Sequence, residues 1–329
     1  MPQFLSYSNP VWDGYCADPF VLRHEGVYYA YGTGSDSGGY ALAGRHFVLL
    51  RSLDLVRWEF LGGAIEPTPG FEKADHWAPE VAFSNGKFWM YYSAAPKDAS
   101  GGCQQQLRVA VADHPEGPFH DTGKLLFPNE GFTIDPSPFR DPRDGQWYLF
   151  FSKNFFEGRV GTGTAVVLLD GDTMTPIGEP CPVVVASADW HTSARNQQIQ
   201  EQTFESWHTV EGAHVVHHNG LYVCFYSGGA WINESYGVSY ATAEHPLGPW
   251  KDAWSAQGPA VLKGVPPHII GPGHNSVTLA PDGKTHICVY HAWDEAHSER
   301  RLCIDPIQWT EDGPRVTPTW QNGRLPVSE

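Results

Sequence analysis

Basic residues are scarce in this chain of 329 residues, which has 21 Lys and Arg against 37 Asp and Glu and a formal net charge of −16. Binding of nucleic acid depends on clustered Lys and Arg, and no basic run is present. Long apolar runs are absent too, and none approaches the roughly 18 residues that a membrane span requires. We therefore expect neither a nucleic acid nor a membrane as a partner.

The chain also lacks a recognisable secretion signal and has few cysteines. The N-terminus, MPQFLSYSNP, lacks the charged and apolar regions of a secretion signal and predicts a cytoplasmic protein, or a secreted one if a signal preceded this start. Of the six cysteines, Cys224, Cys288 and Cys303 lie in apolar, strand-like runs, where a thiol packs as a small hydrophobe. Reduced thiols are therefore expected. The oligomeric state is left open by the sequence.

Turn-forming and aromatic residues, in contrast, are abundant. Charged residues make up 18% of the chain and aromatic residues 13%, and there are 35 Gly and 27 Pro. This composition excludes disordered and coiled-coil proteins, and it suits a turn-rich β protein with aromatic surfaces of the size of a sugar ring.

Five similar segments recur along the chain. Each has a polar first residue, a short apolar strand, a turn that contains Gly and an aromatic-rich strand, and two further strands follow. The polar first residues are Asp18, Glu80, Asp135, Glu211 and His274. The turns EG, NG, DG, NG and DG are typical of tight β-hairpins. Four antiparallel strands repeated five times predict an all-β fold, a five-bladed β-propeller that spans about residues 12–320 of a single domain, 1–329.

One interval between segments is longer than the others. Residues 188–209, ADWHTSARNQQIQEQTFESWHT, are polar and show no alternation of apolar residues. We expect a long surface loop with a short helix here, beside the face where Glu211 begins the fourth blade.

The five polar residues should meet in space, because the innermost strands of a propeller line one central channel. Asp before Pro is by itself a common turn residue, and Asp141 and Asp305, which fall outside the repeat, are interpreted in that way. Four carboxylates and a His at one repeated position would be electrostatically costly without a function. Carboxylates around an accessible pocket are suited to general acid and base catalysis, as in glycoside hydrolysis.

The chain resembles glycoside hydrolase family 43, the five-bladed propeller enzymes that act on glycans containing arabinose and xylose. The resemblance rests on six ordered motifs: YCADPFV, HWAPEV, IDPSPF, VEGAHV, GPGHNS and RLCIDPIQW. It implies Asp18 as general base, Glu211 as general acid and Asp135 as the residue that tunes and orients the acid. It also implies inversion, with the two catalytic carboxyl groups roughly 6.5–9.5 Å apart.

Further site residues follow from the same resemblance. Glu80 is interpreted as a channel residue behind the catalytic groups, and Trp77 as a stacking surface for a sugar ring, with packing between blades as the alternative. Arg301 would bind a substrate hydroxyl or Asp18, and Arg300 is the alternative if the register is off by one residue. His274 resembles the channel His that binds a calcium ion together mainly with water, although from the residues alone it reads as a core histidine. No organic cofactor is expected.

The leading hypothesis is an inverting, exo-acting α-L-arabinofuranosidase on arabinan or arabinoxylan oligosaccharides. A β-xylosidase or an endo-1,5-α-L-arabinanase of the same family is the alternative. A propeller without catalytic activity that binds glycans or proteins is the alternative from another class, because the fold alone does not determine function. Three carboxylates at the matching positions speak against it.

Overall fold

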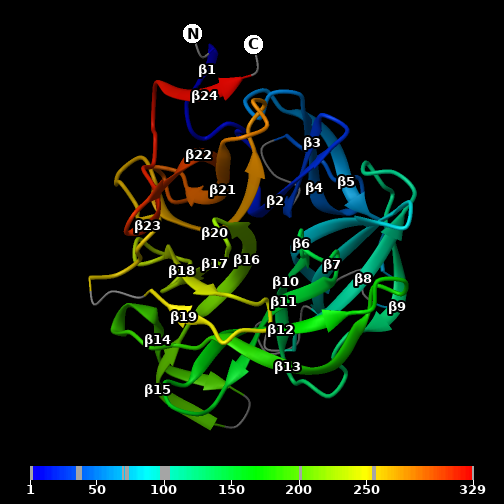
Figure 1. Ribbon diagram of the computed structural model, residues 1–329, viewed down its shortest axis with the longest axis vertical. Coiled ribbons are helices and arrows are strands. Elements are labelled where there is room, and N and C mark those ends of the chain that lie inside the picture. The colour runs from blue at the N-terminus through cyan, green and yellow to red at the C-terminus, as the bar shows by residue number, and fades with distance from the viewer. Residues whose placement is uncertain are drawn as a thin grey trace.

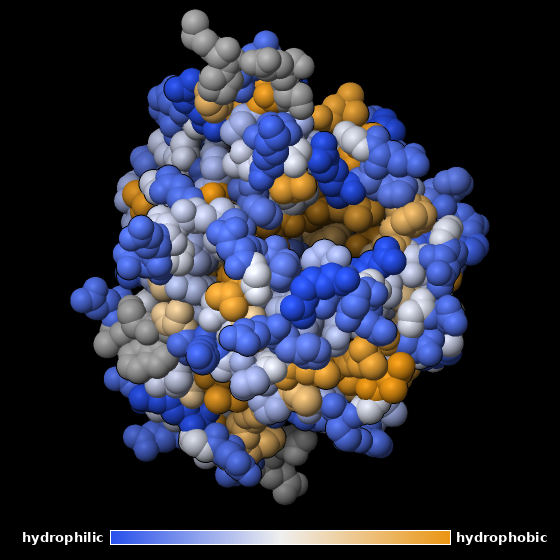
Figure 2. Space-filling model, in the orientation of Figure 1, coloured by the Kyte–Doolittle hydropathy of each residue, from blue (hydrophilic) through white to orange (hydrophobic). Residues whose placement is uncertain are grey.

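Five small antiparallel sheets stand in a ring in the computed structural model (Figure 1), which describes residues 3–34, 39–68, 70, 74–96, 104–199, 202–253 and 257–327. The predicted all-β, five-bladed β-propeller is confirmed. Among the residues that the structure describes, none forms a helix with the length and hydropathy of a membrane span. The face seen in Figure 2 is mainly hydrophilic, and its apolar residues gather in separate patches.

Each blade has four strands in chain order, from the channel outward. The innermost strands are β2 (Ala17–His24), β6 (Ala74–Ser84), β10 (Thr133–Arg140), β16 (Val210–His218) and β20 (Ile270–Leu279). The second strands are β3 (Val27–Thr33), β7 (Lys87–Pro96), β11 (Trp147–Phe155), β17 (Leu221–Gly228) and β21 (His286–Trp293). The third strands are β4 (His46–Ser52), β8 (Gln106–Ala112), β12 (Gly161–Leu169), β18 (Gly237–Ala243) and β22 (Arg300–Thr310). The outermost strands are β5 (Glu59–Ile65), β9 (His120–Leu125), β13 (Pro176–Val184), β19 (Lys251–Asp252) and β23 (Gly313–Val316).

Local turn chemistry accounts for the inner hairpins. Asn85 and Gly86 join β6 to β7, and Asn219 and Gly220 join β16 to β17, and all four residues have positive φ. A two-residue turn of this kind matches the twist of the flanking strands, and Asn and Gly adopt positive φ at low cost. The sequence therefore dictates the start of each of these blades without help from distant residues.

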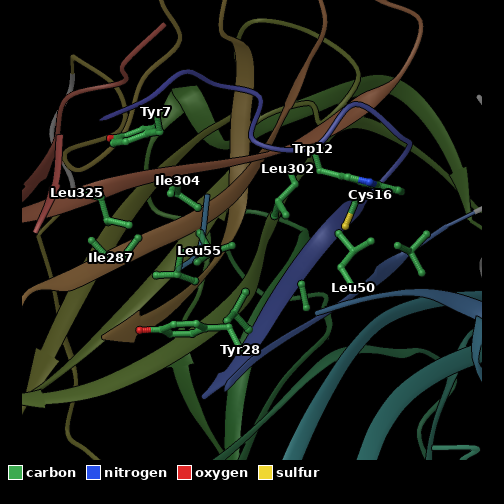
Figure 3. Close-up of a cluster of buried hydrophobic side chains, with 14 of the residues drawn as sticks. Tyr7, Trp12, Cys16, Tyr28, Leu50, Leu55, Ile287, Leu302, Ile304 and Leu325 are labelled. Atoms are coloured by element: carbon green, nitrogen blue, oxygen red, sulfur yellow. The ribbon is translucent and has the colours of Figure 1, made fainter. Parts of the chain in front are cut away.

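The core lies between neighbouring blades. Figure 3 shows the cluster between blades one and five, where Tyr28 and Leu50 pack near Ile287, Leu302 and Ile304. Burial of such apolar side chains is worth about 1.5–3 kcal/mol each. The described cysteines are free, as expected for them: Cys16, Cys181, Cys224, Cys288 and Cys303. Cys103 lies outside the described residues.

The ends of the chain close the ring. Strands β1 (Gln3–Tyr7) and β24 (Gly323–Val327) pair with each other, and the segment before β2 runs along β22 through the hydrogen bond from Val11 N–H to the Leu302 carbonyl (2.9 Å). The carboxylate of Asp305 is buried in β22 and accepts hydrogen bonds from the Tyr7 and Tyr290 hydroxyls at 2.7 and 2.8 Å.

The interpretation of Asp305 as a turn residue is therefore wrong, because its carboxylate ties the N-terminal segment to blade five. Asp141 does lie in a turn, as predicted. Its carboxylate accepts a hydrogen bond from the backbone N–H of Arg143 at 2.9 Å, and its carbonyl accepts one from Gly145 at 2.9 Å.

The predicted long loop at residues 188–209 is also wrong. After a short 3-10 helix, Asp189–His191, the chain forms a hairpin of β14 (Thr192–Ile199) and β15 (Gln202–His208), at the lower left of Figure 1. The hairpin joins blade three at β12, where Gly161 pairs with His208. Many residues of the hairpin are exposed on both faces, so apolar and polar residues do not alternate along its strands. The backbone pairing that stabilises the hairpin therefore leaves no apolar pattern in the sequence.

Candidate active site

A β-bulge turns one residue of each innermost strand out of regular pairing with the second strand. The register shifts at the same place in all five strands. The residues at the shift have φ of 49°, 48°, 56°, 61° and 47°, and they are, in order, Asp18, Ala78, Asp135, Gly212 and His274. Bulges bend a strand and redirect its side chains, and they are frequent at active sites. Each repeat of the sequence therefore begins at or near a β-bulge of an innermost strand.

The structure corrects the register of two repeats. Ala78 and Gly212 occupy the bulge in blades two and four, so Glu80 lies two residues after it and Glu211 one residue before it. Glu211 is therefore equivalent to Trp77 of blade two. Glu80 points to a neighbouring layer of the channel, where its Oε1 lies 3.1 Å from His214 Nδ1.

Side chains of the second strands bind the bulges of neighbouring blades. The backbone N–H groups at three bulges donate to Thr33 Oγ1 (Ala78, 2.8 Å), Ser227 Oγ (His274, 2.7 Å) and His291 Nδ1 (Asp18, 3.0 Å). The N–H of Gly212 donates to Asp135 Oδ2 at 3.2 Å. These bonds fix the bulges of adjacent blades relative to one another.

The Asp18 carboxylate is surrounded by donors and positive charge. Its Oδ2 accepts a hydrogen bond from Thr33 Oγ1 at 2.7 Å, and its Oδ1 one from Arg300 at 3.2 Å. Oδ1 also lies 3.4 Å from His274 Nδ1. Burial alone would raise the pKa of Asp18, but Arg300 and then His274 outweigh burial and hold this pKa well below its usual value. Asp18 is therefore ionised at neutral pH.

Arg300, and not Arg301, reaches Asp18. The Arg300 guanidinium also donates to the Tyr15 hydroxyl at 2.8 Å and lies 4.6 Å from the ring centroid of Trp231. Arg301 instead pairs with two acidic side chains of blade five, Asp294 at 3.2 Å and Glu299 at 3.3 Å. The placement predicted for Arg301 is corrected to Arg300, because adjacent residues of a strand point to opposite faces.

Glu211 has the opposite electrostatic environment from Asp18. Its Oε1 accepts a hydrogen bond from the Tyr236 hydroxyl at 2.7 Å. Burial, and after it the charge of Asp135, raise the pKa of Glu211 to about 7, and burial raises the pKa of Asp135 to about 6. The charge of Asp135 therefore favours the protonated form of Glu211.

His274 lies beside the three carboxylates. Burial opposes its protonation, but the charges of Asp135, Asp18 and Glu211 outweigh burial and raise its pKa. The described residues hold no group of three or more His, Cys, Asp or Glu arranged to bind a metal ion. Close to His274, however, Glu80 Oε2 is buried and has no hydrogen-bond partner. A carboxylate oxygen is a ligand that calcium prefers, so this atom suits a mainly water-bound ion.

A cavity of about 320 Å³ brings the predicted residues together, at the small end of the range for ligand pockets. Its walls include Asp18, Asp135, Glu211, His274, Trp77 and Arg300. Glu80 and Arg301 do not line it. Sequence reasoning missed Trp231, which is 44% exposed and lines the cavity, and Tyr236, which binds Glu211. Both lie in the GGAWINESYG segment after β17, whose aromatic residues in a Gly-rich loop were the available signal.

Comparison with known proteins agrees with this arrangement. The family model described as Glycosyl hydrolases family 43 matches residues 7–314. The chain is 28% identical to the Beta-D-galactofuranosidase xynD of Aspergillus niger, over 93% of this chain and 83% of that protein. It is 26% identical to an Extracellular exo-alpha-(1->5)-L-arabinofuranosidase of Streptomyces avermitilis, over 99% of this chain and 64% of that protein. A crystal structure of a thermostable family-43 glycoside hydrolase superposes with a TM-score of 0.83 at 32% identity, covering 98% of this chain and all of that one.

Proposed function

The chain belongs to glycosyl hydrolase family 43, and from this membership and the cavity we propose that it is an inverting, exo-acting α-L-arabinofuranosidase. It is a glycosidase that hydrolyses O-glycosyl bonds of arabinan- or xylan-type substrates. The finer assignment to arabinose at the end of an arabinan or arabinoxylan oligosaccharide is the proposal. A cytoplasmic location stays a prediction.

One observation carries the proposal: the cavity holds two carboxyl groups in opposite electrostatic environments. Asp18 is kept ionised by Arg300 and His274, while burial and Asp135 raise the pKa of Glu211 to about 7. An ionised carboxylate accepts the proton of an attacking water, and a protonated one donates to the leaving oxygen. We assign these roles to Asp18 and Glu211, and we assign Asp135 the role of sustaining the proton on Glu211.

The small cavity supports exo action on a single terminal sugar. Its aromatic walls, Trp77 and Trp231, offer faces on which a sugar ring can stack. Two relatives carry names of enzymes that release furanose sugars, arabinofuranose and galactofuranose, which supports a furanoside as substrate. A β-xylosidase and an endo-1,5-α-L-arabinanase are the alternatives within the family.

We also propose a calcium ion in the channel, near His274 and the unpartnered Oε2 of Glu80. A calcium-bound His274 would be neutral, so the ion would replace the proton of His274 as the positive charge beside the carboxylates, and water would supply most of its ligands. Elemental analysis of the purified protein and of His274→Ala tests it. Equal calcium content in the two proteins would show that His274 does not bind the ion.

Incubation with aryl α-L-arabinofuranoside, aryl β-D-xyloside and linear arabinan, with product analysis, tests the activity. We expect arabinose released from chain ends, and NMR should show the inverted anomer first. Xylose release or internal cleavage of arabinan would favour an alternative. Binding without turnover of any substrate would indicate a non-catalytic propeller.

A further inference from the structure

A second cavity of about 230 Å³ adjoins the first. The two share Trp77, Ile134, Glu211 and Trp231 as walls. Glu211 faces both cavities, whereas Asp18 and Arg300 line only the first. The proton of a general acid goes to the leaving oxygen, so the leaving group must lie on the side of the acid. The second cavity is on that side.

The far wall of this cavity comes from the β14–β15 hairpin, which is an addition to the four strands of blade three. Gln197, Ile199 and Trp207 of the hairpin line the cavity. Gln197 and Ile199 lie two residues apart on one strand and thus on the same face. The additional hairpin therefore presents one polar and two apolar side chains to the space beside Glu211.

The hairpin is anchored firmly enough to hold this wall in place. Its last residue, His208, donates its N–H to the Val160 carbonyl at 3.0 Å. A Cβ at position 161 would lie 1.9 Å from the His208 carbonyl oxygen, so Gly161 is required for this close approach. The Trp207 ring packs against Phe204 and Phe156, with centroids 5.4 and 6.3 Å away.

Two polar atoms in the second cavity lack partners. Thr162 Oγ1 and Asn154 Oδ1 are buried and make no hydrogen bond, and both residues line the cavity. Thr162 is 7% exposed. A buried polar group without a partner destabilises the protein, and a ligand hydroxyl in the cavity would remove that cost.

We propose that the second cavity binds the sugar of the leaving group. Thr162 Oγ1 and Asn154 Oδ1 would accept hydrogen bonds from hydroxyl groups of this sugar, and Gln197 of the hairpin would also bind it. This inference rests on the proposed glycosidase function and extends it. The hairpin then selects substrates by their leaving group. A nitrophenyl leaving group has no sugar hydroxyl to pair with these atoms, whereas arabinobiose has.

The test compares kcat/KM for nitrophenyl α-L-arabinofuranoside and for linear arabinobiose, or the matching xylosides if the wild type prefers them. Thr162→Val and Gln197→Ala should each lower kcat/KM on the disaccharide by roughly tenfold, and by less than about twofold on the aryl glycoside. Thr203→Val and Gln198→Ala, which change hairpin residues that do not line the cavity, should leave both values unchanged. Equal losses on both substrates, or equal losses in the controls, would overturn the proposal.

Calorimetric titration of arabinobiose into Glu211→Gln separates this proposal from the function on which it rests. Weaker binding after Thr162→Val in that background supports the sugar site even if the wild type cleaves no glycoside tested, an outcome that would overturn only the proposed function. Unchanged binding after Thr162→Val and after Gln197→Ala, in an enzyme that cleaves arabinosides, would overturn only the second site. Melting temperatures identify any variant that loses activity through unfolding.

Discussion

Replacement of Asp135 by Asn should move the alkaline limb of the pH profile of kcat/KM to lower pH. Asn has the size of Asp and can still accept the hydrogen bond from Gly212, but it carries no charge. The pKa of Glu211 is raised from 4.5 to about 7, and Asp135 is the largest cause after burial. Loss of a nearby anion favours the ionised form of Glu211, so its pKa must fall.

We assign Asp135 on the order of one pH unit of this increase, which corresponds to about 1.4 kcal/mol. The alkaline limb would then move from near pH 7 to about pH 6. At pH 7 the protonated fraction of Glu211 would fall from about a half to about a tenth, and kcat/KM would fall roughly fivefold from this cause alone.

The assay is the initial rate on a disaccharide substrate at low concentration, measured from acid to alkaline pH. Asp75→Asn is the control, because Asp75 lines the same cavity but is not among the main charges that raise the pKa of Glu211. Its alkaline limb should stay in place. An Asp135→Asn profile with an unchanged or raised alkaline limb would refute the role assigned to Asp135.

Glu211→Ala should lose on the order of 10²–10⁴ in kcat/KM on a natural oligosaccharide and far less on an activated aryl glycoside, whose leaving group departs without a proton. Equal losses on both would show that Glu211 is not the acid. Arg300→Met should lower kcat/KM on the order of 10²-fold because it removes the cation that keeps Asp18 ionised, while Arg301→Met should change it less than about threefold. A larger loss in Arg301→Met would contradict the register found here. Tyr7→Phe should lower the free energy of unfolding in urea by about 1–3 kcal/mol through the lost bond to buried Asp305, and Tyr40→Phe, which frees only the exposed Asp13, by less than about 1 kcal/mol. An equal loss of unfolding free energy in Tyr7→Phe and Tyr40→Phe would argue against the role of Asp305 in closing the ring.

The number and kind of blades follow from the sequence alone, because their signals are local. Turns such as Asn85-Gly86 and the alternation beside them act over a few residues. Their repetition also placed Asp18, Asp135 and His274 at equivalent positions, and the structure finds all three at bulges around one channel. A repeated unit of four antiparallel strands indicates a propeller whose inner strands form a ring, so the convergence of these residues was predictable without coordinates.

The positions of the bulges in blades two and four could not be found from the sequence. A shift of one or two residues in a strand changes the direction of a side chain, and the repeat in the sequence wrongly placed Glu211 where Gly212 forms the bulge. The sequence also left the choice between Arg300 and Arg301 open. These two residues share one strand but point to opposite faces, and only Arg300 reaches Asp18. The hairpin at residues 192–208 gave no apolar pattern because much of it is exposed.

Only the tertiary structure decided the protonation states and the partners of the catalytic groups. Asp18 and Glu211 have similar intrinsic acidity, and what separates them is a cation beside one and an anion beside the other. Arg300 is 282 residues from Asp18 along the chain, and Tyr236 is 25 residues from Glu211. Electrostatic interaction depends on distance in space and on burial, and neither quantity exists for a side chain until the blades have packed.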